Sequence, residues 1–419
     1  MMKRLTGAGR GASLRGARRA LLWWRPSALL LPLCMCMCMC LCLWLLLWPA
    51  AHAQQGAQRP IKVGAVSALS GPHAFPESSQ AAKAYIDAVN AAGGIGGRRI
   101  EYISLDEGVS PASATAAATR LINDTEVVAL AGSSGLLDCA ANAPRYEAAR
   151  LMSLQGASVS PACFRSSHVV PLNNGPYVGL ASAVLFAHHT LRSRKLCALA
   201  LDLPGMAEGY QQALERLGTA KAMEVPQLQL VGVDQEPAPV LRAVKGQGCD
   251  TVIFTGHEAA VLRWSEAAHA LGAGGMTWIY LTPAYTDRVA RALAPQDGAV
   301  YVMAEFEPWK SRSLPAQDWR RLMQDARLPL SSLSQGGYVA AQMLVRALRQ
   351  VEGPITRETV TRALQQMPPT SHPLLGMPFE IGQRRAHNPN RAALPLKLQQ
   401  GHWYIATPAW IEVPELLAP

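Results

Sequence analysis

Acidic residues are missing from the start of this 419-residue chain. The first 27 residues contain seven basic residues and no acid, and the segment from Ala28 to Trp48 contains no charge at all. Pro49-Ala50-Ala51-His52-Ala53 then supplies a small-x-small cleavage sequence. This order predicts a secretory signal peptide over residues 1–53, cleaved after Ala53. The uncharged run is also long enough for an uncleaved membrane anchor, which is the alternative interpretation.

Without the predicted signal, the basic excess of the chain nearly disappears. The whole sequence has 39 basic and 29 acidic residues, and removal of the seven basic residues before position 54 leaves 32 against 29, a net charge of +3. The charge therefore indicates no nucleic-acid partner. The 366 residues that follow position 53 exceed one small core and favour two domains.

Cysteine is scarce outside the predicted signal. Five of the nine cysteines alternate mainly with methionine between residues 34 and 42, and we interpret this tract as apolar filler rather than a soft-metal site. The remaining four are Cys139, Cys163, Cys197 and Cys249. An even number in an exported chain favours two disulfides, with three pairings possible; four buried free thiols are the alternative.

Residues 61–107 predict one β-α-β unit. An apolar strand from Ile61 to Leu69 precedes a loop at Ser70-Gly71-Pro72, and the next segment repeats apolar residues at helical spacing until Gly93-Gly94. A second strand begins at Arg99. An apolar first strand is typical of a parallel sheet that is covered on both faces.

The alternation of strands and helices continues in two series, which predicts an α/β fold with two doubly wound, Rossmann-like lobes. The first series runs to a strand at Leu151–Leu154, and the second runs from Lys195 to Ala304. After that, helices near 315–325, 332–351 and 356–367 precede short strands near 378–381, 394–398 and 403–406. Cys139 and Cys163 fall in the first series and Cys197 and Cys249 in the second, so this layout favours pairing them in that way.

Polar groups at the predicted strand ends suggest a binding site rather than a catalytic one. Ser70, the turn Gly156-Ala157-Ser158 and the residues around Asp138 precede or begin helices, where free N–H groups and hydroxyls suit an anion. Ligands bind open α/β sheets at this edge. The glycine-rich segment 93–97 joins a helix to a strand, the reverse of a phosphate loop, and His188-His189 are adjacent and thus poor joint metal ligands. We expect no catalytic residues, metal or cofactor.

Several segments together resemble the type I periplasmic solute-binding proteins of ABC importers, in the branched-chain amino-acid (leucine/isoleucine/valine-binding) family. The segments are Ile61-Lys62-Val63-Gly64, Leu69-Ser70-Gly71-Pro72, residues 86–98, Tyr146-Glu147, Gly156-Ala157-Ser158 and residues 337–341. The resemblance implies two lobes joined by three crossings, near Pro171, Ala304 and Thr370. It gives lobe 1 residues 54–171 and 304–370, and lobe 2 residues 172–303 and 371–419.

The resemblance also implies a function. Such proteins trap a small solute in the cleft between their lobes, close by a hinge motion and catalyse no reaction. We therefore expect a monomeric periplasmic protein that takes up an amino acid or a related small carboxylate or amide and passes it to the membrane subunits of an ABC permease. The alternative is a ligand-sensing module of the same fold that regulates a partner protein.

The resemblance places the ligand around nine residues and marks departures from the family. Ser158 replaces the commoner threonine, and Asp138 falls near the usual serine, where it would bind an amine, repel a carboxylate or cap a helix. In the second lobe an expected tyrosine is Met206, and the usual acid is absent near Tyr285. Simple packing is the alternative for Tyr210 and His257. The predicted ligand residues are Ser70, Phe75, Asp138, Gly156, Ala157, Ser158, Met206, His257 and Tyr285, with Phe75, His257 and Tyr285 able to sandwich a planar or apolar ligand.

Overall fold

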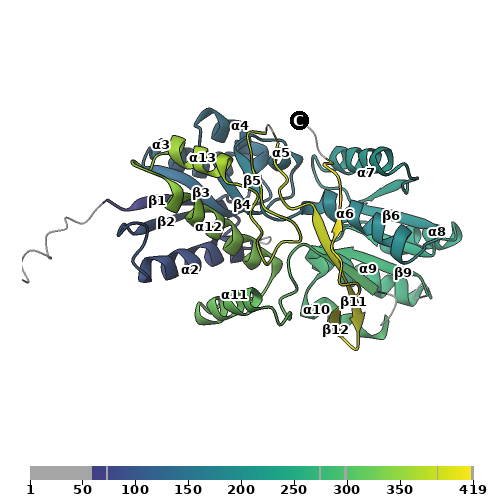
Figure 1. Cartoon of the computed structure of the whole chain (residues 1–419). Helices are drawn as coiled ribbons and strands as arrows, with labels where there is room; N and C mark the ends of the chain where they lie inside the picture. Colours follow the sequence, from purple (N-terminus) through teal and green to yellow (C-terminus); the bar gives the residue numbers. More distant parts are fainter. Residues whose placement is uncertain (1–58, 72–73, 273–274, 297–299, 385, 417–419) are drawn as a thin grey trace, which may run out of the picture. The chain divides into compact units, whose positions relative to one another are not determined.

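The computed structural model describes residues 59–71, 74–272, 275–296, 300–384 and 386–416 (Figure 1). The predicted signal peptide and its cleavage site lie outside these residues, as do Pro72 and His73 of the first loop. Within the described ranges, no helix combines the length and the apolar character needed to cross a membrane.

The first sheet is parallel throughout, as its uninterrupted apolar strands predict. Its strands lie in the order β2 (Ile100–Asp106), β1 (Ile61–Ser67), β3 (Val127–Ser134), β4 (Ser153–Ala157) and β5 (Val169–Pro171). Helices α2 (Glu77–Ala91) and α12 (Ser332–Gln350) pack on one face, while α3 (Pro111–Asn123) and α4 (Asp138–Ala148) pack on the other. Helices α11 (Leu314–Asp325), α13 (Arg357–Gln366) and the short α5 (Pro161–Phe164) complete this unit, which we call lobe 1.

The second sheet has a parallel part and an antiparallel end. Its main path runs β12 (His402–Ile405), β11 (Ala392–Gln399), β10 (Val300–Ala304), β9 (Thr277–Leu281), β8 (Thr251–Phe254), β6 (Leu196–Leu201) and β7 (Leu228–Val231), and β13 (Ile411–Glu412) pairs with β11. The strands from β6 to β10 are parallel; β11 is antiparallel to its neighbours. The helices of this unit, lobe 2, are α6 (Gly175–Leu185), α7 (Ala207–Lys221), α8 (Pro237–Gly246), α9 (Glu258–Ala270) and α10 (Asp287–Ala292).

The fold class predicted from the sequence is confirmed, with two sheets of mostly parallel strands in two lobes. The chain crosses between the sheets after β5, after β10 and before β11. The third crossing lies close to Asn390 rather than Thr370. Residues before it still contact lobe 1, since His387 Nδ1 lies 2.9 Å from the Ser166 carbonyl oxygen and His372 Nε2 lies 2.7 Å from Gln342 Oε1.

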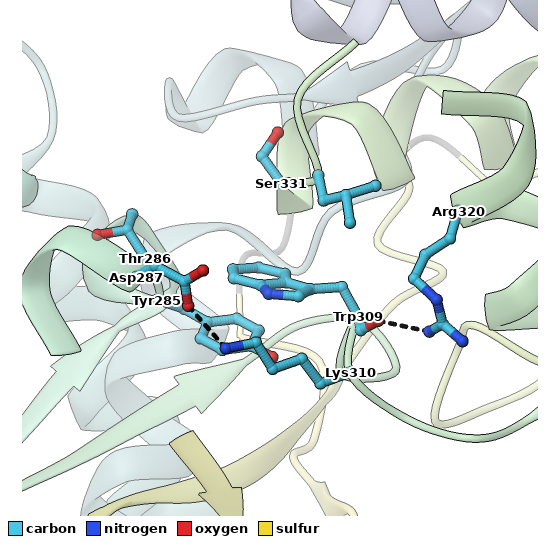
Figure 2. A pocket seen from close by; sticks show the side chains of 8 residues that line it. Tyr285, Thr286, Asp287, Trp309, Lys310, Arg320 and Ser331 are labelled. Atoms are coloured by element: carbon cyan, nitrogen blue, oxygen red, sulfur yellow. Dashed lines mark hydrogen bonds and ion pairs between the residues drawn. The ribbon is translucent and has the colours of Figure 1, made fainter. Parts of the chain in front are cut away.

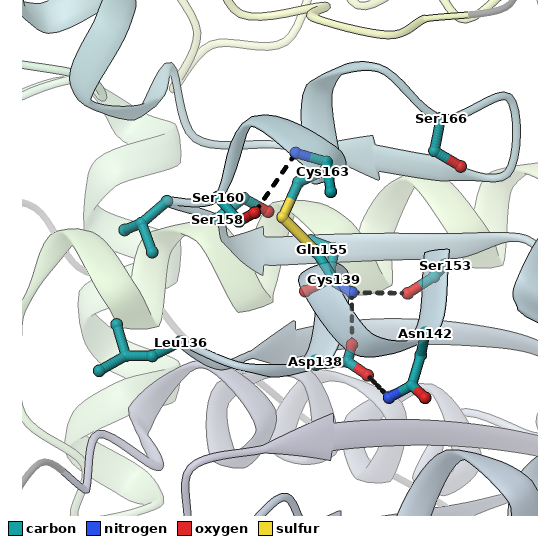
Figure 3. The surroundings of a disulfide bond; sticks show 12 residues. Leu136, Asp138, Cys139, Asn142, Ser153, Gln155, Ser158, Ser160, Cys163 and Ser166 are labelled. Carbon is teal, nitrogen blue, oxygen red and sulfur yellow. Dashed lines mark hydrogen bonds between the residues drawn. A yellow bond between two sulfur atoms is a disulfide. The ribbon is translucent and has the colours of Figure 1, made fainter. Parts of the chain in front are cut away.

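Both disulfides pair within a lobe, as the layout of the sequence favoured. Cys139 on α4 is bonded to Cys163 on α5, with Cα atoms 5.2 Å apart, and Cys197 on β6 is bonded to Cys249 just before β8, with Cα atoms 6.0 Å apart. Figure 3 shows the first bond beside the end of β4. Each disulfide therefore ties together segments of one lobe and leaves the crossings free of covalent links.

Candidate ligand-binding cleft

Ser70 and Phe75 lie in the loop after β1, at the carboxyl edge of the lobe 1 sheet. Ser70 is exposed, and its hydroxyl donates to Asp106 Oδ2 at the end of β2. This hydrogen bond is the main cause that lowers the pKa of Asp106. Phe75 is half-buried, and its N–H donates to the Ala68 carbonyl at 3.0 Å. The loop is thus held from both sides, with Ser70 directed at a carboxylate of its own chain.

Asp138 lies inside lobe 1. It is 0% exposed, and its carboxylate accepts a hydrogen bond from the Tyr146 hydroxyl at 2.7 Å. It also accepts from Asn142 Nδ2 at 2.9 Å and Gln155 Nε2 at 3.0 Å (Figure 3). Burial raises the pKa of Asp138. Asp138 is the first residue of α4, but its carboxylate is bonded to the side chains of Tyr146, Asn142 and Gln155 rather than to the first amides of the helix.

The amides at the start of α4 are instead occupied by Glu107, which the sequence reasoning missed. Glu107 is 2% exposed, and its carboxylate accepts from the N–H groups of Leu136 at 2.9 Å, Leu137 at 3.2 Å and Asp138 at 3.0 Å. Burial raises the pKa of Glu107 against these hydrogen bonds, which favour the charged form. The only signal in the sequence was an acid directly after the second strand.

The segment Gly156-Ala157-Ser158 differs from the predicted turn. Gly156 and Ala157 belong to β4, and a Cβ on Gly156 would lie 1.9 Å from Ser78 Oγ, so glycine is required for α2 to pack on the sheet. Ser158 is 0% exposed, its N–H donates to Asn173 Oδ1 at 2.8 Å, and its carbonyl accepts from Asn173 Nδ2 at 3.0 Å. Within the described residues, the Ser158 hydroxyl has no hydrogen-bond partner.

In lobe 2, Met206 and Tyr210, which were considered as ligand residues, are part of the core. Met206 is 5% exposed and Tyr210 is 2% exposed; the Tyr210 hydroxyl lies 3.4 Å from Thr255 Oγ1, and its ring centroid lies 5.2 Å from that of Tyr177. His257 is exposed at the start of α9, where its Nδ1 accepts from the Ala260 N–H at 3.4 Å. Packing explains Met206 and Tyr210, and helix capping explains His257.

Tyr285 is the one predicted ligand residue that lines the larger of two described pockets, a cavity of about 580 Å³. Its ring stacks on Trp309 with centroids 3.6 Å apart and an interplanar angle of 16° (Figure 2). The stack sits between elements of both lobes, because Arg320 comes from α11, and Leu330 and Ser331 lie at the start of α12. The remaining lining residues are Thr286, Asp287 and Lys310.

We call this cavity the Trp309 pocket. Of its two basic side chains, Lys310 has an acidic partner among the described residues and Arg320 has none. Lys310 Nζ lies 3.0 Å from Asp287 Oδ1. Arg320 Nη1 donates to the backbone carbonyls of Trp309 and Ser311, the second at 2.8 Å, and no carboxylate of the described residues forms an ion pair with it. The pocket therefore combines an aromatic wall with one guanidinium that carries no acidic partner there, an arrangement suited to an anion.

The structure does not gather the nine predicted residues into one site. Ser70 and Phe75 stay at the lobe 1 edge, and Tyr285 joins the Trp309 pocket. Trp309 and Arg320 were missed, although Trp309-Lys310 follows closely on the predicted second crossing near Ala304. That proximity was the available signal, since residues next to a crossing lie between the lobes.

Two doubly wound lobes joined by three crossings, with a pocket lined from both, define a bilobal binding protein. A family model described as periplasmic binding protein matches residues 60–402. The chain therefore belongs to the periplasmic binding protein family, and its two lobes have the type I fold of these proteins. No curated protein matches the sequence.

Solved structures show the same fold at low identity. The substrate-binding protein of a fatty acid ABC transporter from Thermomonospora curvata has 19% identity and a TM-score of 0.71, covering 86% of this chain and 95% of its own. An R. palustris ABC transporter solute-binding protein in complex with 4-hydroxybenzoate has 19% identity and a TM-score of 0.69, with coverages of 84% and 97%. The branched-chain amino acid transporter substrate-binding protein from Streptococcus pneumoniae, in complex with isoleucine, has 16% identity and a TM-score of 0.67, with coverages of 84% and 99%.

Proposed function

We propose that this protein is a periplasmic receptor that captures a small solute between its lobes and delivers it to an ABC importer. The observation that carries the proposal is the Trp309 pocket, whose walls come from both lobes. A solute held there touches lobe 1 through α11 and lobe 2 through Tyr285, so its binding favours the state in which both walls are present. A volume of about 580 Å³ suits a small molecule.

The chemistry of the pocket favours a small carboxylate with a flat or apolar body. The stacked pair Tyr285 and Trp309 offers an aromatic wall, and Leu330 extends the apolar lining. Arg320 supplies donors for a carboxylate, whereas Lys310 is already paired with Asp287. Hydroxybenzoate, fatty acids and isoleucine, which are associated with the similar structures, share a carboxyl group. Amides and amino acids belong in the same test panel.

The first test measures binding to the purified protein. Isothermal titration calorimetry and thermal shift against aromatic acids, fatty acids, branched-chain amino acids and their amides should identify at least one carboxylate that raises Tm in a saturable way. Arg320→Gln should weaken that ligand at least tenfold, corresponding to about 1.4 kcal/mol, because a charge-assisted hydrogen bond is lost.

A matched control separates the pocket from surface charge. Arg321→Gln removes the neighbouring exposed guanidinium on the same helix and should leave the affinity unchanged. Equal losses in the two variants would argue against an anion site at Arg320. A panel in which no solute stabilises the wild-type protein would argue against solute binding itself, and uptake by membrane vesicles that carry the permease would then be the decisive measurement of delivery.

A further inference from the structure

Lobe 1 already holds an anion of its own at the edge where ligands bind open α/β sheets. The Glu107 side chain follows β2 and reaches across to the first turn of α4, where its two oxygens accept three backbone N–H groups. The backbone of Glu107 is fixed as well, because its N–H donates to the Ser67 carbonyl at 2.9 Å at the end of β1. The carboxylate is therefore locked in place by backbone contacts on both sides.

The surroundings are shaped for this carboxylate. A Cβ on Gly135 would lie 2.0 Å from Glu107 Oε2, so the chain has no side chain where the oxygen sits. The neighbouring Leu136, whose N–H is bonded to Glu107, is 40% exposed, whereas Glu107 itself is 2% exposed. The negative group also matches the positive end of the α4 dipole.

A second backbone N–H group at this edge, that of Ser158, is also hydrogen-bonded within the chain. The Ser158 N–H, which follows the end of β4, donates to Asn173 Oδ1 at 2.8 Å, and Asn173 is only 6% exposed. The N–H groups at the start of α4 and of Ser158, at the edge where ligands bind open α/β sheets, are thus engaged by side chains of the chain itself. Under the proposed function, a ligand acid is bound by Arg320 instead.

We propose that Glu107 is a specificity-determining residue whose carboxylate takes the place of a ligand carboxylate on the amides of α4. With that position filled, the amides at the start of α4 offer a ligand no anion site, and an acidic group of a solute that reaches α4 meets the negative charge of Glu107. The inference extends the proposed solute-binding function, on which its consequence for ligand choice rests.

Removal of the carboxylate should turn the position into a site for free carboxylates. In Glu107→Ala, acetate or formate should raise Tm in a saturable way, by about 2 °C at ten times the dissociation constant. Acetamide and matched sodium chloride should not do so, and neither the wild type nor Glu101→Ala, which removes an exposed acid from β2, should respond to acetate. If Glu107 acted only as a stabilising contact, the variant would lose Tm and bind no acetate.

A double-mutant cycle tests the same geometry without any added ion. Gly135→Ala should lower Tm in the wild type, where its Cβ displaces the Glu107 carboxylate, and should have little effect in the Glu107→Ala background. Additive effects of the two substitutions would overturn the proposal, as would an equal response of Glu107→Ala to acetate and to chloride. If Glu107→Ala folds only with acetate, a saturable dependence of the folded yield on acetate supports the proposal.

The consequence for ligand choice is measured with pairs of acids and their amides. Glu107→Ala should bind acids relatively better than the wild type does, by about tenfold for a solute that reaches α4. Because acetate binding needs no transported solute, failure of the proposed transport function leaves the acetate result unchanged. Failure of acetate binding, with solute binding intact, rejects only the role of Glu107.

Discussion

Single buried residues decide which polar groups of lobe 1 remain free for a ligand. Glu107 covers the amides of α4, Asn173 covers the amide of Ser158, and Asp138 is bonded inside the lobe. A buried donor that is already paired offers nothing further to a solute, since a new partner would have to displace the old one. The roles predicted for Asp138 and Ser158 in ligand binding stay predictions. Three hydrogen bonds to its carboxylate favour a structural role for Asp138, whereas the Ser158 hydroxyl has no hydrogen-bond partner among the described residues.

The buried neutral side chain of His372 leads to a prediction about the stability of the protein at acidic pH. His372 is 8% exposed; its Nδ1 accepts from the Leu374 N–H at 3.1 Å and its Nε2–H donates to Gln342 Oε1 at 2.7 Å. Burial lowers the pKa of His372 from 6.5 to about 4. Between these values the unfolded chain takes up a proton that the folded chain does not, so stability is lost as the pH falls, by about 2 kcal/mol at pH 5.

His372→Gln should remove this slope. When the pH is lowered from 7 to 5, His372→Gln should gain about 2 kcal/mol of urea-unfolding free energy relative to the wild type, whereas the exposed control His402→Gln should follow the wild type. Identical slopes for wild type and His372→Gln would show that the imidazole is accessible to protons in the folded state.

At the scale of elements, glycines allow α2, α12 and β4 to approach one another closely. A Cβ on Gly337 would lie 1.8 Å from the Ser78 carbonyl oxygen, and a Cβ on Gly336 would lie 2.0 Å from the Gly156 carbonyl oxygen. These neighbours are backbone atoms, which cannot rotate away as a flexible side chain would. The contact holds together the first and last parts of lobe 1, which are about 260 residues apart in the sequence.

Gly337→Ala should therefore destabilise lobe 1 strongly. We expect a loss of about 3 kcal/mol, because α12 must move away from α2 or distort. Gly246→Ala is the matched control: that glycine ends α8 with nothing within 4 Å of the added Cβ, and alanine there should be neutral or slightly stabilising. Chemical denaturation measures both, and comparable effects would contradict the close approach.

At the scale of the whole molecule, the three crossings are joined by one buried polar network. Glu305, 6% exposed after β10, accepts from the Asn174 N–H at 3.2 Å at the start of α6. Asn390 Nδ2 donates to the carbonyls of Leu172 at 3.1 Å and Glu305 at 3.0 Å, and Asn174 Nδ2 donates to the Ala392 carbonyl at 3.0 Å. Each crossing therefore contacts the others through backbone and amide groups.

Burial in this network raises the pKa of Glu305 to about 7. The folded protein then binds a proton that the unfolded chain releases above its ordinary pKa near 4.5. The contribution of Glu305 to stability is accordingly largest in acid and is lost as the pH rises from about 4.5 through 7, by roughly 3 kcal/mol in all. This slope is opposite in sign to that of His372.

Glu305→Gln should abolish the alkaline loss, because the amide cannot ionise while its oxygen still accepts from Asn174. As the pH rises from 5 to 8, Glu305→Gln should gain about 2.5 kcal/mol of unfolding free energy relative to the wild type and to the exposed control Glu352→Gln, since the contribution of His372 is common to all three proteins. An equal pH dependence in all three proteins would mean that Glu305 does not take up the proton. Ligand affinity measured over the same pH range would show whether ionisation of Glu305 affects the closure of the lobes.

The sequence by itself determined the α/β class and the two lobes, and it favoured two disulfides, paired as the structure shows them, over four free thiols. These features follow from local signals, namely strand and helix periodicity, glycine stops and the distribution of Cys139, Cys163, Cys197 and Cys249 between two series. The position of the third crossing did not follow, because residues 371–391 have weak periodicity and their contacts with lobe 1 are distant in sequence.

Only the tertiary structure decided which polar groups are available to a ligand. Periodicity tells which face of an element is apolar, but it does not tell that Glu107 reaches the amides of α4 or that Asp138 turns inward. Nor does it bring Tyr285, Trp309 and Arg320 to one pocket. Those arrangements depend on packing between segments far apart in the chain, where burial and hydrogen-bond satisfaction are settled jointly by all the partners.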